Sequence, residues 1–423
     1  MTTETDAGRA QILDWLEAER AEIKDLFKSL LRAPSPNPPG DTLAAARVVR
    51  DYLDGAGLDY QVIDPHPEMP NIVASFDGAR SGRHLVLNGH IDVFPVTQDH
   101  HGWTHDPWTA VEMDGAIYGR GASDMKPGTT ASIITYALLH RLQSDLCGRL
   151  TLTCVSDEET FGPWGARYLM EHHPEVHGDC MLNGEPGGPG SIRFGERGPF
   201  WVEFNVRAKG AHGAYVHITE SATKIAMAVA RDLEELTQIE GALPHNVASA
   251  VDAGRPVMDR MMGAGAGDLV SKVTLNIGMI KGGEKVNMIP SECSFLADFR
   301  LPIGLDKSEL VPKLDEITGR YPGVTWSEIG GDASSWCDPH HEMVGILQRN
   351  VEAFGYPRPT PIVSLGGTDA RLWRHYNVPA YVYGPYPHGM GSHDEHVRID
   401  EFLHVVRTHV LSAWDYLSVG TVN

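Results

Sequence analysis

Hydrophobic and polar positions follow two different periods along the chain, and these predict helices and strands in turn. Apolar side chains recur at helical spacing over residues 9–32, and the proline-rich segment 33–41 ends that helix. Asp41 is expected to cap a second helix that ends near Gly55. Strand-like runs follow (DYQVID, NIVASF, HLVLNGH and AIYGRG), then a helix over about 128–142 and the buried-strand run RLTLTCVS. This α/β pattern predicts a mostly parallel, mixed sheet covered by helices.

The order of elements changes near residue 195. The strand PFWVEFNVRAKG is followed by a helix over 219–237, the strands KVTLNIGMIKGG and SECSFLADFRLP, a helix over 306–320 and the strand VTWSEI. This order is typical of a ferredoxin-like α+β insert. The α/β alternation resumes after about residue 332, with a helix over 342–354, the strand PAYVYGP and a helix from about Asp400. We therefore predict a discontinuous α/β domain over 1–196 and 332–423, interrupted by an inserted domain over 197–331. The segment MMGAGAGD, 261–268, is expected to be a loop of the insert.

Composition narrows the class of protein. The 423 residues are 42% hydrophobic and 22% charged, as in ordinary globular proteins. A formal net charge of −21 argues against nucleic acid as a partner, because phosphate backbones recruit an excess of Lys and Arg. The sequence shows no secretory signal and no run of 18 apolar residues, so we expect no membrane span. Five cysteines without CxxC spacing are expected to be free thiols, which fits a cytoplasmic protein.

Acidic and imidazole side chains follow apolar runs or glycine-rich turns at several distant points of the chain. Each therefore lies where a strand is expected to end, at the sheet edge where α/β proteins bind ligands. Together these side chains fit one two-metal hydrolase site, because divalent metals such as zinc take histidine nitrogen and carboxylate oxygen. They are His90, Asp92, Asp124, Glu158, Glu159, Glu185 and His393.

Two pairs within this set suggest a division of roles. Asp92 lies two residues after His90, on the same side of an extended strand, and can hold the second N–H of the imidazole. Taken alone, the pair is more typical of a satisfied surface pair. The neighbours Glu158 and Glu159 cannot both point the same way from an extended chain, so one can bind metal while the other acts as a general base. Taken alone, two such glutamates are typical of a solvated loop.

The ordered segments GHIDVFP, GRGASDMKPG, DEE, NGEP, GGTDAR and GSHDEH resemble one metallopeptidase family. Its members include acetylornithine deacetylase, succinyl-diaminopimelate desuccinylase, aminoacylase, carnosinase and glutamate carboxypeptidase. The resemblance covers nearly the whole chain and implies a metal-binding α/β domain with an inserted lid that also dimerises. It implies that Glu158 is the general base and that Asp92 orients His90. The implied metal ligands are His90, Asp124 (as the bridge), Glu159, Glu185 and His393.

The insert carries positions of its own that match the family. In RAKGAHGAYVH, His212 matches the lid histidine that stabilises the oxyanion in the partner subunit's site. In KVNMIPSECSFLADFR, Asn287 and Arg300 match the residues that hold a substrate carboxylate. The alternative for Arg300 is an ion pair with Asp298. In GGTDAR, backbone N–H groups around Gly367 and the side chain of Thr368 are expected to line the pocket.

These features predict a metal-dependent hydrolase that cleaves an amide C–N bond of a small carboxylate-bearing substrate, of the N-acyl amino acid deacylase or dipeptidase type. One or two divalent metals per subunit are expected, zinc first, with manganese or cobalt as alternatives. We also expect a homodimer or a higher homo-oligomer. The alternative activity is an aminohydrolase acting on a non-peptide C–N bond such as that of an aromatic amine. A non-catalytic, metal-dependent binding protein is the alternative from another class. Ser/His/Asp catalysis is disfavoured, since the sequence has no GxSxG elbow.

Overall fold

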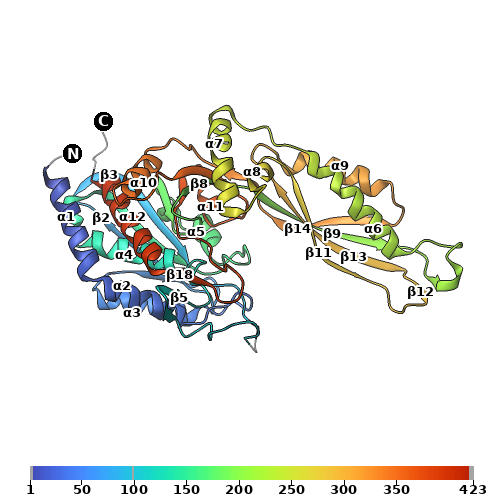
Figure 1. The fold of residues 1–423 in the computed structure, drawn as a ribbon, viewed down its shortest axis with the longest axis horizontal. Helices are drawn as coiled ribbons and strands as arrows, with labels where there is room; N and C mark the ends of the chain where they lie inside the picture. Colours follow the sequence, from blue (N-terminus) through green and yellow to red (C-terminus); the bar gives the residue numbers. More distant parts are fainter. Residues whose placement is uncertain (1–2, 98–99, 419–423) are drawn as a thin grey trace. The chain divides into compact units, whose positions relative to one another are not determined.

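The computed structural model describes residues 3–97 and 100–418, and its chain divides into two compact units (Figure 1). The first unit comprises residues 1–194, 337–362 and 368–423, and the second comprises 195–336 and 363–367. Compactness defines these units. The discontinuous catalytic domain over 1–196 and 332–423, interrupted by a lid and dimerisation domain over 197–331, stays a prediction.

A mixed nine-stranded sheet forms the frame of the first unit, although its strand at residues 335–336 and the ends of two other strands belong to the second unit. Its four central strands, β6, β3, β7 and β17, are parallel to one another, whereas the flanking pairs β1–β2, β2–β6, β17–β8 and β8–β15 are antiparallel. The predicted mostly parallel, mixed sheet is therefore confirmed. In spatial order the strands are β1 (Gln61–Ile63), β2 (Asn71–Asp77), β6 (Cys147–Val155), β3 (Arg80–His90), β7 (Cys180–Asn183), β17 (Ala380–Val382), β8 (Ser191–Glu196) and β15 (Ser335–Trp336), with β16 (Thr360–Ser364) also paired to β8.

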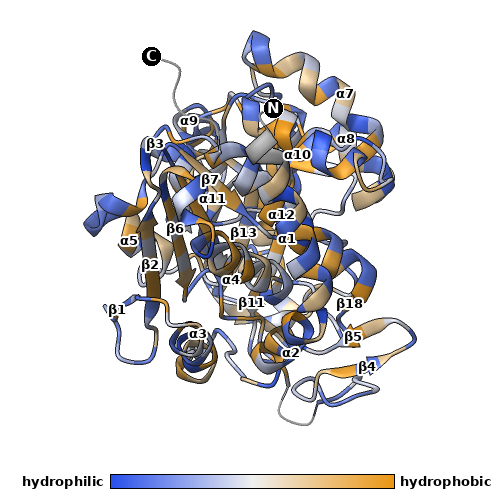
Figure 2. Cartoon of the chain, turned by 90° about the vertical axis from the view of Figure 1, so that its left-hand side faces the viewer, coloured by the Kyte–Doolittle hydropathy of each residue, from blue (hydrophilic) through white to orange (hydrophobic). Residues whose placement is uncertain are grey.

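Helices contact this sheet and cover its hydrophobic side chains. Val86 of β3 belongs to a core cluster with Leu169 and Trp373, from the short helices α5 (Ala166–His172) and α11 (Ala370–His375). Its neighbours Leu85 and Leu87 point to the opposite face, because side chains alternate along a strand. The helices α4 (Lys126–His140) and α12 (Ile399–Leu417) also contact β3. Figure 2 colours β2 and β6 mainly as hydrophobic, whereas the helix α2 (Arg20–Leu31) carries both colours and buries one side only.

The N-terminal part of the chain departs from the predicted helix over 9–32. Two helices stand there, α1 (Thr3–Ala18) and α2 (Arg20–Leu31), so the prediction of one continuous helix is wrong at Glu19. The next helix, α3 (Leu43–Gly55), begins after Asp41, whose carboxylate accepts a hydrogen bond from the Leu43 N–H at 3.1 Å. The remaining long helix of the first unit is α10 (Glu342–Glu352). The run AIYGRG contributes to a separate small sheet of β4 (Val111–Met113), β5 (Ala116–Tyr118) and β18 (His396–Arg398).

The second unit has the predicted ferredoxin-like order of elements. Its antiparallel sheet runs β11 (Thr274–Gly282), β13 (Glu292–Leu301), β9 (Gly198–Arg207), β14 (Val324–Gly331), and its core is closed by α6 (Ala222–Leu233) and α9 (Lys307–Gly319). Asp306 and Glu309 form a capping box at the start of α9. A two-stranded ribbon of β10 (Ala211–His212) and β12 (Met288–Ile289) extends from this unit's chain.

The predicted loop over 261–268 is wrong at both of its ends. Residues 261 and 262 close the helix α7 (His245–Met262), and a second short helix, α8 (Ala266–Leu269), follows after two glycines with positive φ. The helix α7 is difficult to predict from the sequence because two helix breakers, Gly254 and Pro256, lie within the helix. Across residues 3–97 and 100–418, no helix combines the length and apolar character that crossing a membrane requires.

Candidate metal centre

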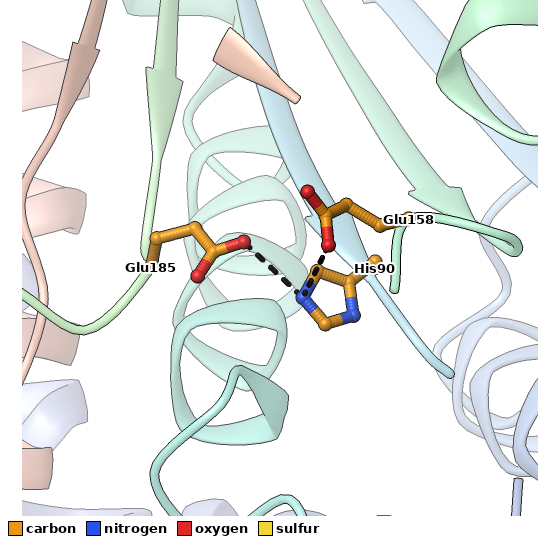
Figure 3. Close-up of side chains that lie close together, drawn as sticks. All are labelled: His90, Glu158 and Glu185. Carbon is orange, nitrogen blue, oxygen red and sulfur yellow. Dashed lines mark ion pairs between the residues drawn. The ribbon is translucent and has the colours of Figure 1, made fainter. Parts of the chain in front are cut away.

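The parallel strands bring three of the predicted site residues, two metal ligands and the general base, to one edge of the sheet. His90 is the last residue of β3, which is paired on one side with β6 and on the other with β7. Glu158 follows the end of β6, and Glu185 follows the end of β7. Because parallel strands end at the same edge, these three side chains converge, as Figure 3 shows.

His90 lies at the centre of the cluster and is completely buried. Its Nε2 atom is 3.2 Å from Asp124 Oδ1, 3.2 Å from Glu185 Oε1 and 4.0 Å from Glu158 Oε2. On the other side of the ring, Nδ1 donates to the backbone oxygen of Asp92 at 2.9 Å and lies 3.4 Å from Asp92 Oδ1. Burial opposes the charged form of the imidazole, but hydrogen bonds to Asp124, Asp92 and Glu185 together raise the pKa of His90.

Asp92 is held in place by neighbours from two other segments. Its Oδ2 atom accepts hydrogen bonds from Asn37 Nδ2 at 2.9 Å and from the Glu159 backbone N–H at 3.1 Å. Asn37 also donates to Asp157 Oδ1 at 3.0 Å, so one amide group bridges two buried carboxylates. Asp92 therefore lies beside the Nδ1 side of His90, where the orienting role expected of it requires it to be.

The glutamates of the cluster retain protons more strongly than free carboxyl groups do. Burial, reinforced by neighbouring carboxylates, raises the pKa values of Glu158 and Glu159 well above their ordinary value. Burial and the nearby Asp124 raise the pKa of Glu185 to about 8. The Oε1 atoms of Glu158 and Glu159 are both buried without a hydrogen-bond partner among the described residues. Such a concentration of carboxylates is destabilising unless protons or a cation neutralise it.

Two groups in this cluster have ligand atoms that all lie within 4.8 Å of one another. One consists of His90, Glu158 and Glu185, and the other of His90, Asp124 and Glu159. Imidazole nitrogen and carboxylate oxygen are suitable donors for zinc, manganese and cobalt. The unsatisfied carboxylate oxygens and the mixed donor set therefore fit a divalent metal centre.

The sequence interpretation missed two residues that position Asp124. Glu395 Oε1 accepts hydrogen bonds from the backbone N–H groups of Ser123 at 2.8 Å and Asp124 at 3.0 Å. Arg120 forms an ion pair with Glu395, and both side chains are buried. The only hint in the sequence is that Glu395 belongs to the same GSHDEH segment as His393.

A third missed residue, Arg371, lies beside Glu158. Its Nη1 atom is 3.6 Å from Glu158 Oε1 and donates to the Thr368 backbone oxygen at 2.6 Å. The guanidinium group also stacks on the Phe161 ring, with Cζ 4.1 Å from the ring centroid. Arg371 and Thr368 are both buried, so GGTDAR supplies a cation to the cluster as well as backbone groups.

His393 belongs to neither of the two ligand groups found among the described residues. Its side chain is exposed and packs edge-on to Trp103, with ring centroids 6.5 Å apart. The ring also fits closely against Gly102, where an added Cβ would approach ring atoms to 2.7 Å. The role of His393 as a metal ligand stays a prediction.

The predicted residues of the second unit fall at two separate places. His212 and Asn287 are brought together by the β10–β12 ribbon, in which the Gly213 N–H donates to the Asn287 oxygen at 2.7 Å. Arg300 is paired with Pro199, at the opposite end of the β9–β13 pair from Arg207, after which the ribbon begins. Its guanidinium forms an ion pair with Asp298 at 2.9 Å, the alternative considered from the sequence. Within one chain, therefore, Arg300 and Asn287 do not form one binding site.

Fold and site together define a metal-dependent amidohydrolase. The family model for Peptidase family M20/M25/M40 matches residues 86–414, so the chain belongs to this family. Among curated relatives, a succinyl-diaminopimelate desuccinylase of Cereibacter sphaeroides is 28% identical over 385 residues, covering 88% of this chain and 93% of the relative. Aminoacylase-1 of Sus scrofa is 26% identical over 411 residues, with coverage of 92% and 94%. The fold is similar to that of an M20 family metallo-carboxypeptidase from Sulfolobus solfataricus, with a TM-score of 0.77, 17% identity and coverage of 93% and 99%.

Proposed function

We propose that this enzyme removes the acyl group of a small N-acyl amino acid, or cleaves a dipeptide, with Glu158 as the general base. The observation that carries the proposal is the environment of Glu158. Its carboxyl group is buried, has a raised pKa, and lies between the His90 imidazole and the Arg371 guanidinium. The names of the curated relatives, desuccinylase and aminoacylase, denote removal of acyl groups and favour deacylation.

The metal ligands that we propose are His90, Asp124, Glu159, Glu185 and His393, holding one or two divalent ions per subunit, with zinc favoured over manganese and cobalt. When bound, such ions polarise a carbonyl group and lower the pKa of water. Asp92 holds the imidazole of His90 through its Nδ1 side, and Glu395 holds the backbone of Asp124. These contacts fix the ligand atoms before any metal arrives.

Glu158 moves the proton in the proposed reaction. Its carboxylate takes a proton from the attacking water, whose oxygen forms the new bond to the carbonyl carbon. Glu158 then returns the proton to the leaving nitrogen as the C–N bond breaks. A glutamate suits both steps when burial raises its pKa towards neutrality. Arg371 keeps the carboxylate form accessible, because its positive charge offsets the neighbouring carboxylates.

The remaining roles belong to residues of the second unit and of GGTDAR. We propose that His212 stabilises the oxyanion in a partner subunit, and that Asn287 and Arg300 take the substrate carboxylate, with Gly367 and Thr368 lining the pocket. The separation of Asn287 from Arg300 within one chain favours an assembly in which two subunits complete each site. A homodimer is therefore part of the proposal.

A hydrolysis screen with metal-loaded enzyme tests the proposal. The substrates are N-acetyl and N-succinyl amino acids, dipeptides and aminobenzoate-type aromatic amines, and the enzymes are the wild type, Glu158→Gln and the control Glu171→Gln, an exposed residue of α5. We expect metal-dependent release from an acyl amino acid or dipeptide. Glu158→Gln should lower kcat about 100-fold or more with metal content unchanged, whereas Glu171→Gln should not. Near-normal turnover by Glu158→Gln with metal bound contradicts the role of Glu158. Turnover of aromatic amines alone contradicts the proposed substrate class and supports an aminohydrolase.

A further inference from the structure

A pocket of the first unit, separate from the metal centre, lies between α1, α2 and α12 and has a volume of about 340 Å³. Its apolar lining comes from Leu13, Leu16, Ile23, Leu403 and Val406. None of its lining residues belongs to the metal centre described above. The volume lies within the usual range of small-molecule sites.

Arg407 brings a positive charge into this pocket without an anion to balance it. Its guanidinium stacks on Phe354, with Cζ 3.7 Å from the ring centroid, and its Nη2 donates to His404 Nδ1 at 3.2 Å. The Nε atom is buried without a hydrogen-bond partner, and no carboxylate of the described residues forms an ion pair with Arg407. Burying part of a guanidinium without a counter-ion is unfavourable. A ligand anion that binds beside Arg407 would therefore gain a favourable electrostatic interaction.

Besides Arg407, the charged side chains that line the pocket are those of Arg20, Glu17 and Asp400. Arg20 lines the rim and forms no ion pair with any described residue. Two acidic residues, Glu17 and Asp400, also line the pocket. Asp400 is already paired with Arg398 at 3.2 Å, which leaves Glu17 alone against two arginines. The pocket therefore suits a small carboxylate with an apolar body, and Glu17 can in addition take an ammonium group.

A chain of hydrogen bonds leads from Arg407 to the segment that carries Glu185. Because Arg407 donates to His404 Nδ1, the proton of the neutral imidazole is on Nε2, which donates to the Tyr383 hydroxyl at 2.7 Å. That hydroxyl in turn donates to the Pro189 backbone oxygen at 3.4 Å. Pro189 lies in the glycine-rich segment that begins with Glu185. A ligand that draws the Arg407 guanidinium away from His404 therefore weakens the hydrogen bond between the Tyr383 hydroxyl and the Pro189 oxygen.

We propose that this pocket is an effector site for a small organic carboxylate with an apolar body, and that occupancy weakens metal binding through the Arg407–His404–Tyr383–Pro189 chain. The ligand's carboxylate takes the guanidinium groups of Arg407 and Arg20, and its apolar body covers Leu13, Leu16 and Leu403. The proposal goes beyond the hydrolytic function and does not depend on which substrate the enzyme cleaves. Linkage requires the reciprocal effect: removing the metal tightens carboxylate binding by the same factor.

Calorimetric titration of the metal-loaded enzyme with 4-methylpentanoate tests the site. We expect Arg407→Gln to weaken binding about tenfold or more, because a charge-assisted hydrogen bond is lost. Leu16→Trp, which places a larger side chain in the pocket and keeps Arg407, should also abolish binding. Two controls should bind normally: Arg349→Gln, an exposed arginine outside the pocket, and Arg300→Gln, which alters the proposed substrate carboxylate site. Leucine as a second probe distinguishes an amino acid from a plain carboxylate, and 4-methylpentylamine should not bind.

Competition with a chromogenic chelator tests the coupling. We expect 4-methylpentanoate to weaken metal affinity about fivefold or more in the wild type, and Tyr383→Phe to bind the carboxylate while losing this effect. The proposal is overturned if the carboxylate does not bind, if Arg407→Gln binds it unchanged, if Arg300→Gln alone abolishes binding, or if metal affinity does not respond. None of these outcomes depends on turnover, so they are distinct from failure of the proposed hydrolytic function.

Discussion

The guanidinium of Arg371 lies 3.6 Å from Glu158 Oε1, deep within the carboxylate cluster. It is the only arginine for which an ion pair with Glu158 is observed within the described parts of the chain. Arg371 also fixes the Thr368 backbone oxygen and stacks on Phe161, so three contacts hold its charge in place.

We expect Arg371→Gln to lower kcat about tenfold or more, with a smaller effect on KM. The substitution removes the positive charge that balances Glu158 but leaves a side chain able to donate one hydrogen bond. Steady-state kinetics on the substrate found by the screen provides the measurement, and Arg349→Gln serves as the exposed control. An unchanged kcat for Arg371→Gln would show that Glu158 does not depend on this cation.

Replacing Asn37 by Asp should destabilise the fold and weaken metal binding. The Asn37 amide donates to Asp92 Oδ2 and Asp157 Oδ1, so a carboxylate in its place would put three like charges together in a buried site. Loss of these hydrogen bonds alone costs about 1–3 kcal/mol in the free energy of unfolding. Urea denaturation measures this change. Asn377→Asp is the matched control, since Asn377 is exposed and has a positive φ of 61° that Asp also tolerates. Equal losses in the two variants would argue against the bridging role of Asn37.

Chelating the metal should lower the melting temperature. A metal that binds only the folded state adds about 2.7 kcal/mol of stability when its free concentration is 100 times its Kd. Scanning calorimetry with and without chelator, followed by addition of zinc, manganese or cobalt, measures the effect and ranks the three metals. His90→Gln removes the residue shared by both ligand groups and should abolish the response. A wild-type melting temperature that ignores chelation despite measured metal loss would contradict the proposed centre.

Stability should fall as the pH drops below about 6.5, in part because of His409. Its imidazole is buried and donates through Nε2 to the Tyr383 backbone oxygen at 2.7 Å, and burial lowers its pKa to about 4. The unfolded chain, with a histidine pKa near 6.5, therefore binds more protons between about pH 4 and 6.5, and protonation favours unfolding there. Above about pH 6.5 the full stability contribution is present.

The comparison of His409→Gln with the wild type isolates this contribution. The difference in unfolding free energy between the two proteins should change by about 3 kcal/mol from pH 7 to pH 4, since each pKa unit corresponds to about 1.4 kcal/mol. Urea titrations at several pH values measure it, with the exposed His172→Gln as control. A constant difference across this range would mean that His409 is not neutral in the folded protein.

Much of the site could be predicted because sequence pattern and sheet geometry agree. His90, Glu158 and Glu185 follow buried strand runs, and parallel strands must end at one edge, so their convergence follows from local patterns. The positioning residues Asn37, Arg371 and Glu395 could not be found in this way. Each comes from a loop or a short helix, and its partner lies far along the chain, so no local periodicity indicates the contact.

In the insert, too, local sequence patterns did not predict every helix or the relative positions of the site residues. The strand and helix patterns predicted the ferredoxin-like order, but α7 was missed because Gly254 and Pro256 interrupt its pattern while packing against neighbours maintains the helix. Likewise, the matching motifs named both Asn287 and Arg300, yet the register of β9 and β13 places them at opposite ends of the strand pair.

The sequence by itself determined the class of fold, the residue types of the proposed ligand set and the strand ends near which three of the site residues lie, because hydrophobic periodicity and residue type are local properties. Only the tertiary structure decided which carboxylate meets which cation, which glutamate oxygens stay without hydrogen bonds, and how Asp92 and Asp124 are held. These depend on distances between segments remote in the chain, and burial then converts those distances into the raised pKa values of Glu158, Glu159 and Glu185.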